Sequence, residues 1–253
     1  MTEEEKRTSK KIFGLLGKNI SYSFSSGYFS EKFTELNLNG YSYLNFDLES
    51  IQQFHELLNK HMIHGMNVTI PYKEEIIDFL DEIDQEAKEI GAVNTIKFST
   101  DGKLIGFNTD VYGFRKSIAS LLEDHHTKAL ILGTGGASKA IAYALNSLGI
   151  ATVFVSRTPN GLKEISYMEL TSSLMASFTL IINCTPVGTF PETNLYPAIP
   201  YQYITSKHLL YDLIYNPSQT EFLKKGKNQG AVIKNGLEML QLQAEKSWVI
   251  WNQ

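Results

Sequence analysis

Cysteine is almost absent from this chain, because Cys184 is the only one among 253 residues. A single thiol excludes an internal disulfide and any metal site built from several cysteines. The histidines, at positions 55, 61, 64, 125, 126 and 208, do not form the H-E-x-x-H pattern of a metalloprotease helix. The sequence therefore predicts no metal site.

Long hydrophobic runs and an excess of positive charge are also missing. No apolar run approaches the roughly 18 residues that a membrane-spanning helix needs, and the charged segment 1–11 lacks the apolar stretch of a signal peptide. Lys and Arg total 23 against 27 Asp and Glu, a formal net charge of -4, which gives no general attraction to nucleic acid or anionic membranes. The 43% of apolar residues is enough for globular cores. Together, these observations lead us to expect a cytoplasmic protein without nucleic-acid or membrane partners.

Glycine is concentrated at an informative place, the stretch Leu130–Ser138, which reads LILGTGGAS. A short apolar run breaks into glycines there, and a helical pattern follows. The first glycine permits a tight turn, the next two let backbone approach a phosphate, and the small serine lets the helix pack on the strand. The helix N-terminus then offers N–H groups and a positive dipole to an anion. The glycines alone fit a plain turn equally well. With their context they predict a dinucleotide pyrophosphate site at Gly133, Gly135, Gly136, Ala137 and Ser138.

The end of the next predicted strand, 151–155, indicates which dinucleotide binds. Enzymes that bind NAD usually carry Asp or Glu there to hold the ribose 2′-hydroxyl. Here the residues are Ser156, Arg157 and Thr158, so no carboxylate repels a 2′-phosphate, and a guanidinium is present that can bind one through two hydrogen bonds. A solvated arginine is the alternative. We predict that the cofactor is NADP.

The apolar patterning divides the chain into two halves that each alternate strands and helices. The first half has predicted strands at 12–17, 41–46, 65–70, 92–98 and 104–107 and helices at 25–38, 48–58 and 71–82. A hairpin turn at Asp101–Gly102 is predicted to pair the last two strands. The second half has predicted strands at 128–132, 151–155, 179–183, 208–213 and 231–233 and helices at 112–122, 140–145, 219–225 and 236–251.

This order predicts two α/β domains, with a parallel sheet in each half. Residues 1–110 form the first domain, to which the C-terminal helix 236–253 returns. Residues 111–235 form a Rossmann-type NADP-binding domain.

Polar residues gather at the predicted strand ends of the first half. Each has a local explanation: a serine or threonine caps a helix, Asp110 caps the helix that follows it, and Lys73 is a solvated first-turn lysine. These explanations do not account for the clustering of all of them in one half. The residues concerned are Ser23, Ser25, Asn67, Thr69, Lys73, Asn94, Thr95 and the run Asn108–Asp110.

Several segments in fixed order resemble the motifs of the shikimate dehydrogenases, within the shikimate/quinate dehydrogenase family, and the resemblance extends across nearly the whole chain. The segments are 65–73 (GMNVTIPYK), 91–95 (GAVNT), 106–110 (GFNTD), 133–138, 182–188 (INCTPVG), 211–217 (YDLIYNP) and 235–240 with Gln243. The resemblance implies reversible reduction of 3-dehydroshikimate by NADPH, in the biosynthesis of chorismate and the aromatic amino acids.

The resemblance also implies roles for individual residues. Lys73 and Asp110 would be the catalytic pair, because a lysine can donate a proton to the oxygen that gains charge during hydride transfer. The substrate carboxylate would be held by Ser23 and Ser25, helped by Thr69 and Tyr215, and the ring hydroxyls by Asn67, Asn94, Asp110 and Gln243. The remaining cofactor contacts would come from Thr185, Val187, Gly236 and Met239.

The chain departs from the family pattern at two places. In the serine segment, Phe24 stands where lysine is usual and Ser26 where proline is usual. After Arg157 the second basic residue of the family is missing at the matched position, and Lys163 is an unmatched neighbour. The sequence therefore predicts a weaker preference for NADP than the family norm.

Two alternative functions stay open on the sequence alone. One is a quinate/shikimate dehydrogenase that uses NAD or both cofactors. The other is a non-catalytic module that senses a nucleotide or metabolite, against which the presence of both Lys73 and Asp110 argues. We expect a monomer or a homodimer.

Overall fold

The computed structural model describes residues 10–20 and 23–253. Residues 1–9 lie outside this range. They make up most of the charged segment 1–11, in which the sequence predicts no signal peptide. The chain divides into two compact units. One contains the residues up to Thr109 together with Ala244–Gln253, and the other contains Asp110–Gln243.

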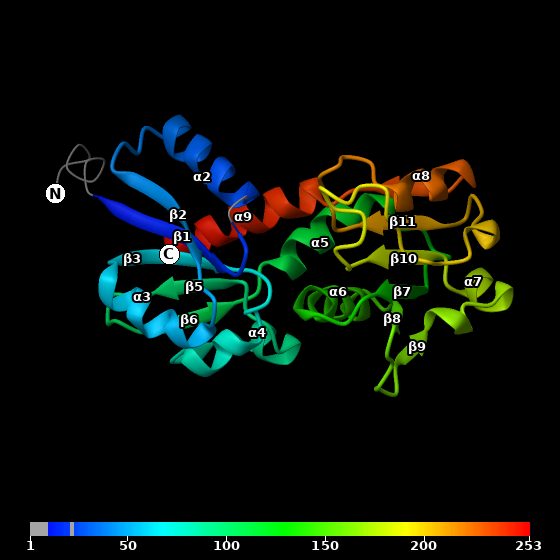
Figure 1. Ribbon diagram of the computed structural model, residues 1–253, viewed down its shortest axis with the longest axis horizontal. Coiled ribbons are helices and arrows are strands. Elements are labelled where there is room, and N and C mark those ends of the chain that lie inside the picture. Colours follow the sequence, from blue (N-terminus) through cyan, green and yellow to red (C-terminus); the bar gives the residue numbers. More distant parts are fainter. Residues whose placement is uncertain (1–9, 21–22) are drawn as a thin grey trace. The chain divides into compact units, whose positions relative to one another are not determined.

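The first unit is built on a six-stranded sheet with the order β2-β1-β3-β5-β6-β4 (Figure 1). Its strands are β1 (Lys11–Gly17), β2 (Tyr41–Asp47), β3 (Ile63–Val68), β4 (Glu82–Ile83), β5 (Thr95–Phe98) and β6 (Leu104–Phe107). The prediction of a sheet that is parallel throughout is wrong for this unit, because β5 runs antiparallel to β3. The predicted hairpin is confirmed, because β5 is also antiparallel to β6. The turn at 101–102 is too short for the crossover that parallel neighbours need.

The helices of the first unit cover both faces of this sheet. They are α2 (Phe24–Glu35), η1 (Ile51–Gln53), α3 (Phe54–Lys60), η2 (Glu75–Phe79), α4 (Gln85–Ile90) and the end of α9 (Leu237–Trp251). The predicted helix 71–82 is wrong: residues 71–74 form a turn and only a short 3-10 helix follows. The chain becomes extended at Leu80, where it leaves the helix to form β4.

Two hydrophobic cores fill the two faces of the sheet. One includes Phe54 and Ile76 with residues of α3 and η2. The other is aromatic and includes Phe13 and Phe29, with Trp251 of α9 packed against it. The indole of Trp251 also donates a hydrogen bond to the Ile96 carbonyl at 3.0 Å. The end of α9, from Ala244, therefore returns to the first unit, whereas its residues up to Gln243 belong to the second, so the predicted segment 236–253 is divided between the two.

A mixed aromatic and ionic contact joins α2 to α9. The Tyr28 hydroxyl donates to a carboxylate oxygen of Glu245, and Lys32 pairs with the same carboxylate at 2.7 Å. The ring of Phe24 stacks on Tyr28 with a centroid distance of 5.5 Å. Phe24, which replaces the usual lysine, therefore helps to fix the first turn of α2.

The second unit contains a six-stranded sheet with the order β12-β11-β10-β7-β8-β9 (Figure 1). Its strands are β7 (Lys128–Leu132), β8 (Ala151–Ser156), β9 (Glu164–Ser166), β10 (Leu180–Asn183), β11 (Leu209–Asp212) and β12 (Val232–Lys234). Every pairing is parallel. This is the order 3-2-1-4-5-6 of a doubly wound dinucleotide-binding sheet, and it confirms the predicted Rossmann-type domain.

Helices cover the second sheet as well. They are α5 (Asp110–Ile118), η3 (Ala119–Leu121), α6 (Gly136–Ser147), η4 (Tyr167–Glu169), α7 (Ser172–Ser177), η5 (Tyr201–Tyr203), α8 (Glu221–Asn228) and the beginning of α9. A core that includes Leu130, Ile181 and Phe222 fills one face, and Phe114 of α5 packs edge-on to Tyr211 at 5.0 Å. Among the described residues, no helix has both the length and the apolar character to cross a membrane.

Candidate functional site

The predicted pyrophosphate loop connects β7 to α6 in the second unit. Gly133 has a φ of 101°, in the left-handed region, and a Cβ there would lie 3.2 Å from a methyl carbon of Thr185. A Cβ on Gly135 would meet no atom within 4 Å, so the space beside this backbone is open. Ser138 is fully buried, as its role in close packing requires. A glycine turn with open space at the start of a 12-residue helix has the shape that a diphosphate needs.

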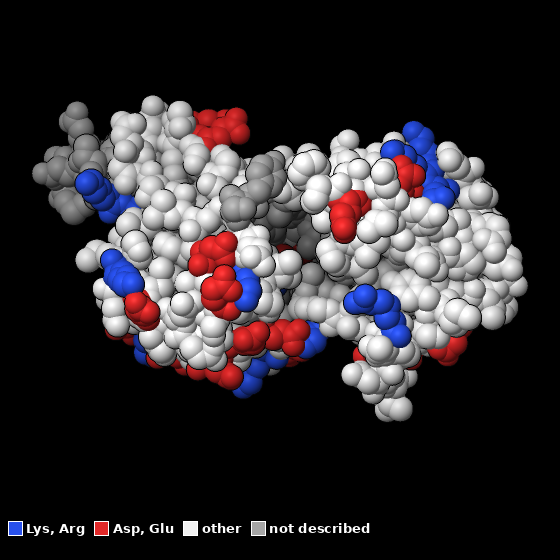
Figure 2. All heavy atoms as spheres, in the orientation of Figure 1, with Lys and Arg blue, Asp and Glu red and all other residues white. Residues whose placement is uncertain are grey.

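The residues predicted to select the cofactor follow β8. Arg157 is exposed, and its charge lies close enough to Tyr167 to oppose the rise in the pKa of that phenol that burial causes. The Ser156 hydroxyl accepts a hydrogen bond from the Thr158 N–H at 3.2 Å. In the second unit, Figure 2 shows Lys and Arg side chains grouped over the region of α6 and β8. This end of the unit therefore presents positive charge to solvent.

The loop after β10 contains Thr185 and Val187. Asn183, the last residue of β10, accepts hydrogen bonds from the Thr185 N–H at 3.1 Å and from its hydroxyl at 2.6 Å. The Thr185 hydroxyl in turn accepts from the Val187 N–H at 3.3 Å. The two predicted cofactor residues are thus held by one buried amide.

The first turns of α9 carry three more predicted residues. A Cβ on Gly236 would lie only 2.1 Å from the Leu213 carbonyl oxygen, so no larger residue fits there. Met239 is buried, and its carbonyl oxygen would lie 2.5 Å from a Cβ on Gly113 of α5. Gln243 is buried as well, and its side-chain amide donates to the Leu240 carbonyl at 3.0 Å.

Asn67 is the centre of a buried hydrogen-bond network in the first unit. Its carbonyl oxygen accepts from the Tyr43 hydroxyl at 2.8 Å. Its amide nitrogen donates to the Ser247 hydroxyl at 2.9 Å and to the Thr95 hydroxyl at 3.2 Å. These partners come from β2, β5 and α9, so they fix the amide of a predicted substrate residue from three sides.

Asn94 belongs to the same hydrogen-bond network, because Thr95 contacts the side chains of both asparagines. Its carbonyl oxygen accepts from the Thr109 N–H at 2.7 Å, from the Thr109 hydroxyl at 3.1 Å and from the Thr95 hydroxyl at 3.0 Å. Thr109 immediately precedes Asp110, which is buried and begins α5. Asn94 therefore anchors the chain directly before the predicted catalytic carboxylate.

The two predicted serines differ in their contacts. Ser25 is buried within α2, and its hydroxyl makes a hydrogen bond to the Tyr43 hydroxyl that opposes the burial-driven rise in the pKa of that phenol. Ser23 occupies the N-cap position of α2, yet its side chain makes no capping bond. Its hydroxyl oxygen is buried and has no hydrogen-bond partner within the described parts of the chain. Burying a hydroxyl in this way is costly unless a ligand supplies the partner.

Thr69 and Lys73 follow β3, with Thr69 before the turn at 71–74 and Lys73 within it. The Thr69 N–H donates to the Leu16 carbonyl at 2.8 Å, and the Lys73 carbonyl accepts from the Val93 N–H at 2.7 Å. The second contact ties Lys73 to the chain next to Asn94. Tyr215, in the second unit, is half-buried in the loop after β11.

The sequence analysis missed several residues that hold the predicted ones. Tyr43 and Ser247 support Asn67, and Asp212 supports Asn183 at 3.0 Å. The signal for Tyr43 was hidden because an aromatic residue is common in any strand. Ser247 is a polar residue on the buried side of α9, and that position was its only signal.

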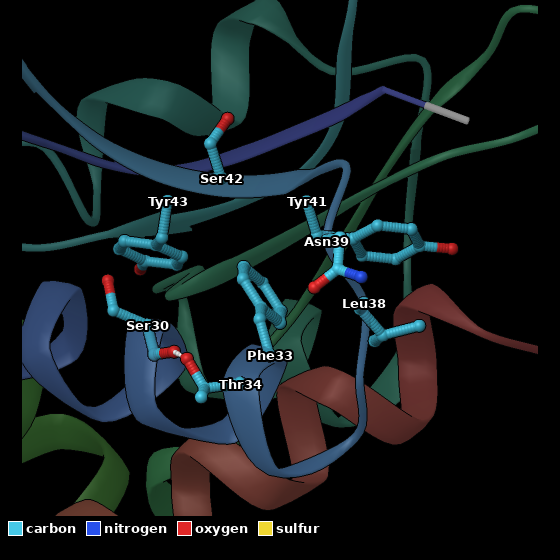
Figure 3. Close-up of a pocket in the computed structure, with 8 residues that line it drawn as sticks. All are labelled: Ser30, Phe33, Thr34, Leu38, Asn39, Tyr41, Ser42 and Tyr43. Carbon is cyan, nitrogen blue, oxygen red and sulfur yellow. Dashed lines mark hydrogen bonds between the residues drawn. The ribbon is translucent and has the colours of Figure 1, made fainter. Parts of the chain in front are cut away.

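A separate pocket of about 360 Å³ lies between α2 and β2 (Figure 3). In Figure 3, the Tyr43 ring extends from β2 toward α2, and Phe33 rises from α2 toward the strand. None of the predicted site residues lines this pocket, and the hydroxyl of its lining residue Tyr43 donates to Asn67. Its lining residues are Ser30, Phe33, Thr34, Leu38, Asn39, Tyr41, Ser42 and Tyr43. Among the residues that the structure describes, no group of three or more His, Cys, Asp or Glu side chains is placed to hold a metal ion.

Comparison with known proteins gives concordant results. The family described as the shikimate dehydrogenase substrate binding domain matches residues 15–96. A protein of Carboxydothermus hydrogenoformans named shikimate dehydrogenase (NADP(+)) is 39% identical over 95% of this chain and 91% of its own. The crystal structure of shikimate dehydrogenase 1 from Peptoclostridium difficile has a TM-score of 0.84 at 38% identity, covering 96% of this chain and 91% of that one. A Thermus thermophilus shikimate 5-dehydrogenase in complex with NADP(H) and shikimate has a TM-score of 0.81 at 29% identity, covering 95% and 93%.

Proposed function

This chain belongs to the shikimate dehydrogenase family, and we propose that it catalyses the NADP-dependent interconversion of shikimate and 3-dehydroshikimate. The reaction serves the biosynthesis of chorismate and the aromatic amino acids. The observation that carries this proposal is the similarity, over nearly the whole chain, to enzymes named shikimate dehydrogenase (NADP(+)).

The two units would bind different molecules. The first unit, with Ser23, Ser25, Asn67, Thr69 and Asn94, would hold the substrate. The second unit, which contains the Rossmann-type sheet, would hold the cofactor, and it also contains Asp110, Tyr215 and Gln243.

Substrate recognition in this account depends on charge and on fixed amides. The buried Ser23 hydroxyl, which has no described partner, would donate to the substrate carboxylate, and a hydrogen bond to a charged group is stronger than one between neutral groups. Asn67 and Asn94 would face ring hydroxyls with amides whose orientation the surrounding network already fixes. Preorganised polar groups of this kind reduce the entropy lost on binding.

Proton transfer would be the task of Lys73. NADPH, when bound, supplies the hydride that adds to the ketone carbon of 3-dehydroshikimate, and the carbonyl oxygen then gains negative charge. Lys73 would donate a proton to this oxygen to give the hydroxyl of shikimate. Asp110 would orient and stabilise the lysine ammonium through its negative charge.

The cofactor would bind at the carboxyl end of the parallel strands. Gly133, Gly135, Gly136, Ala137 and Ser138 form the turn into α6 and would receive the diphosphate. Ser156, Arg157 and Thr158 would contact the 2′-phosphate, and Thr185, Val187, Gly236 and Met239 would line the nicotinamide side.

The assignment of Lys73 is tested by Lys73→Ala. We expect kcat for shikimate oxidation to fall about 100-fold or more, because general acid–base groups contribute on this scale, while the Kd for NADPH stays within about twofold. Lys88→Ala, which removes an exposed lysine of α4 in the same unit, is the matched control and should keep wild-type turnover. Undiminished turnover in Lys73→Ala would refute the catalytic role.

A further inference from the structure

We propose that Asp212 is a positioning residue for cofactor binding, because its buried carboxylate holds the loop that carries Thr185 and Val187. This inference rests on the proposed function, which places the cofactor against that loop. Asp212 does not itself touch the cofactor in this account and acts through Asn183.

Asp212 and Asn183 are neighbours by strand register. They are the last residues of β11 and β10, and the parallel pairing of these strands places them side by side. Both side chains are fully buried. The carboxyl end of a parallel sheet is where such folds bind their ligands, so the pair lies beneath the loops that would form the cofactor site.

The carboxylate of Asp212 is surrounded by hydrogen-bond donors. One oxygen accepts from the Asn183 side-chain amide at 3.0 Å and from the Ile214 N–H at 3.1 Å, and the other accepts from the Thr220 hydroxyl at 2.5 Å. All three partners are donors, and a carboxylate is the side chain that can accept from all of them. An asparagine could keep its oxygen toward Asn183 and Ile214 and turn its NH₂ to the Thr220 hydroxyl, which can also accept, whereas an apolar side chain accepts from none of the three.

The donor role of Asn183 toward Asp212 determines how its amide is oriented. With its NH₂ directed at the carboxylate, the amide oxygen is left to accept from the backbone N–H and hydroxyl of Thr185. Thr185 then accepts from the Val187 N–H. A continuous path of hydrogen bonds therefore runs from Asp212 to both proposed cofactor residues.

A second path from Asp212 reaches the loop that follows β11. The Ile214 carbonyl, next to the N–H bound by Asp212, accepts from the Gly236 N–H at 3.1 Å. Two residues further on, the Asn216 carbonyl accepts from the Phe190 N–H at 3.2 Å. The same carboxylate thus connects the loops after β10 and β11 with the start of α9.

A purely structural role does not account well for this acid. Burial of the carboxylate disfavours its charged form and raises its pKa to about 6, even though the hydrogen bonds from Thr220, Ile214 and Asn183 act in the opposite direction. Apolar residues of similar volume often stabilise a core as well as buried charges do. What a hydrophobic side chain cannot do is fix the Asn183 amide.

The test compares NADPH affinity with thermal stability in three variants. Asp212→Leu and Asn183→Ala both interrupt the path to Thr185, and we expect each to raise the Kd for NADPH about tenfold, the effect of losing one or two hydrogen bonds. Thr220→Val is the matched control. It removes a donor to the same carboxylate on the side of α8, so it should lower Tm and leave the Kd within about twofold. Fluorescence titration with NADPH alone, well below Tm, gives the Kd.

Two results would overturn the inference. One is wild-type affinity for NADPH in folded Asn183→Ala, which is informative even where Asp212→Leu does not fold. The other is an equal loss of affinity in Thr220→Val, because the effect would then follow stability alone. Failure of the wild-type protein to oxidise shikimate with NADP would refute the proposed function instead, and the titration distinguishes the two.

Discussion

At the scale of single residues, Asn67 and Asn94 of the first unit are held by hydrogen bonds to neighbouring side chains and backbone. The side-chain oxygen of Asn67 accepts one hydrogen bond and its amide nitrogen donates another, and the side-chain oxygen of Asn94 accepts two from Thr109. Ser23 differs from these two asparagines, because its buried hydroxyl, like the side-chain oxygen of Asn45, has no partner within the described residues. A ligand oxygen that accepts a hydrogen bond from this hydroxyl would satisfy a buried donor that has no other described partner.

This contrast predicts the effect of Ser23→Ala. Removing a hydroxyl that donates to a carboxylate should raise the KM for shikimate at least tenfold, with little change in the KM for NADP. Steady-state kinetics with each substrate varied in turn measure both constants. Ser30→Ala, an exposed serine of the same helix, serves as the control and should behave like the wild type. An unaltered KM for shikimate in Ser23→Ala would exclude this contact.

The sequence predicts single residues best where backbone geometry demands a residue type. Gly133 needs a positive φ, and a glycine in a strand-to-helix turn announces that need. Tyr43, Ser247 and Asp212 could not be recognised in this way, because their importance depends on partners 24, 180 and 29 residues away along the chain. Only the packed structure brings such pairs together.

At the scale of elements, long periodic segments are predicted well and short ones are not. The strands of the second sheet from β7 to β12 follow the predicted positions except for β9, which has three residues. The helix predicted at 71–82 is replaced by a turn and a 3-10 helix, because Ile76 and its apolar neighbours fit the core without a full helical repeat. Periodicity alone cannot separate these two local structures in so short a segment.

Single buried side chains also fix the connections between short elements. His208 is one of them, because it bonds to the turn before β11 and to α7. It precedes β11 and is buried. Its Nδ1 accepts from the Thr205 N–H at 3.0 Å, and its Nε2 lies 3.1 Å from the Met175 carbonyl of α7. This pattern requires the neutral ring with the proton on Nε2. Burial lowers the pKa of His208 from its ordinary value of 6.5, and the charge of nearby His125 acts in the same direction.

The consequence is a stability that depends on pH. As pH falls below about 6.5, the unfolded chain binds a proton at this position before the folded protein does, so the free energy of unfolding decreases. We expect Tm of the wild type to fall more steeply below this pH than Tm of His208→Gln, which has no titrating ring. The exposed His55 supplies the control variant His55→Gln, which should retain the steeper dependence. Equal pH profiles for the wild type and His208→Gln would contradict the argument.

At the scale of the whole molecule, the chain enters the second unit at Asp110 and returns to the first at Ala244. The sequence predicts this organisation because the glycine loop lies near residue 133, which leaves a separate first half to be explained. It predicts the antiparallel hairpin of β5 and β6 but not the antiparallel pairing of β5 with β3, since strand direction depends on the connections between strands. The central claim, a dehydrogenase that acts on shikimate with NADP, rests on both units being functional together.

The most direct test is the reduction of NADP by the purified protein in the presence of shikimate, followed by absorbance of the reduced nicotinamide. Parallel reactions contain quinate in place of shikimate and NAD in place of NADP. We predict rapid reduction with shikimate and NADP, and slower reaction in every other combination. A folded protein that binds NADPH and yet reduces neither cofactor with either substrate would contradict the account and favour a sensing module, whereas comparable rates with quinate and NAD would identify a quinate/shikimate dehydrogenase.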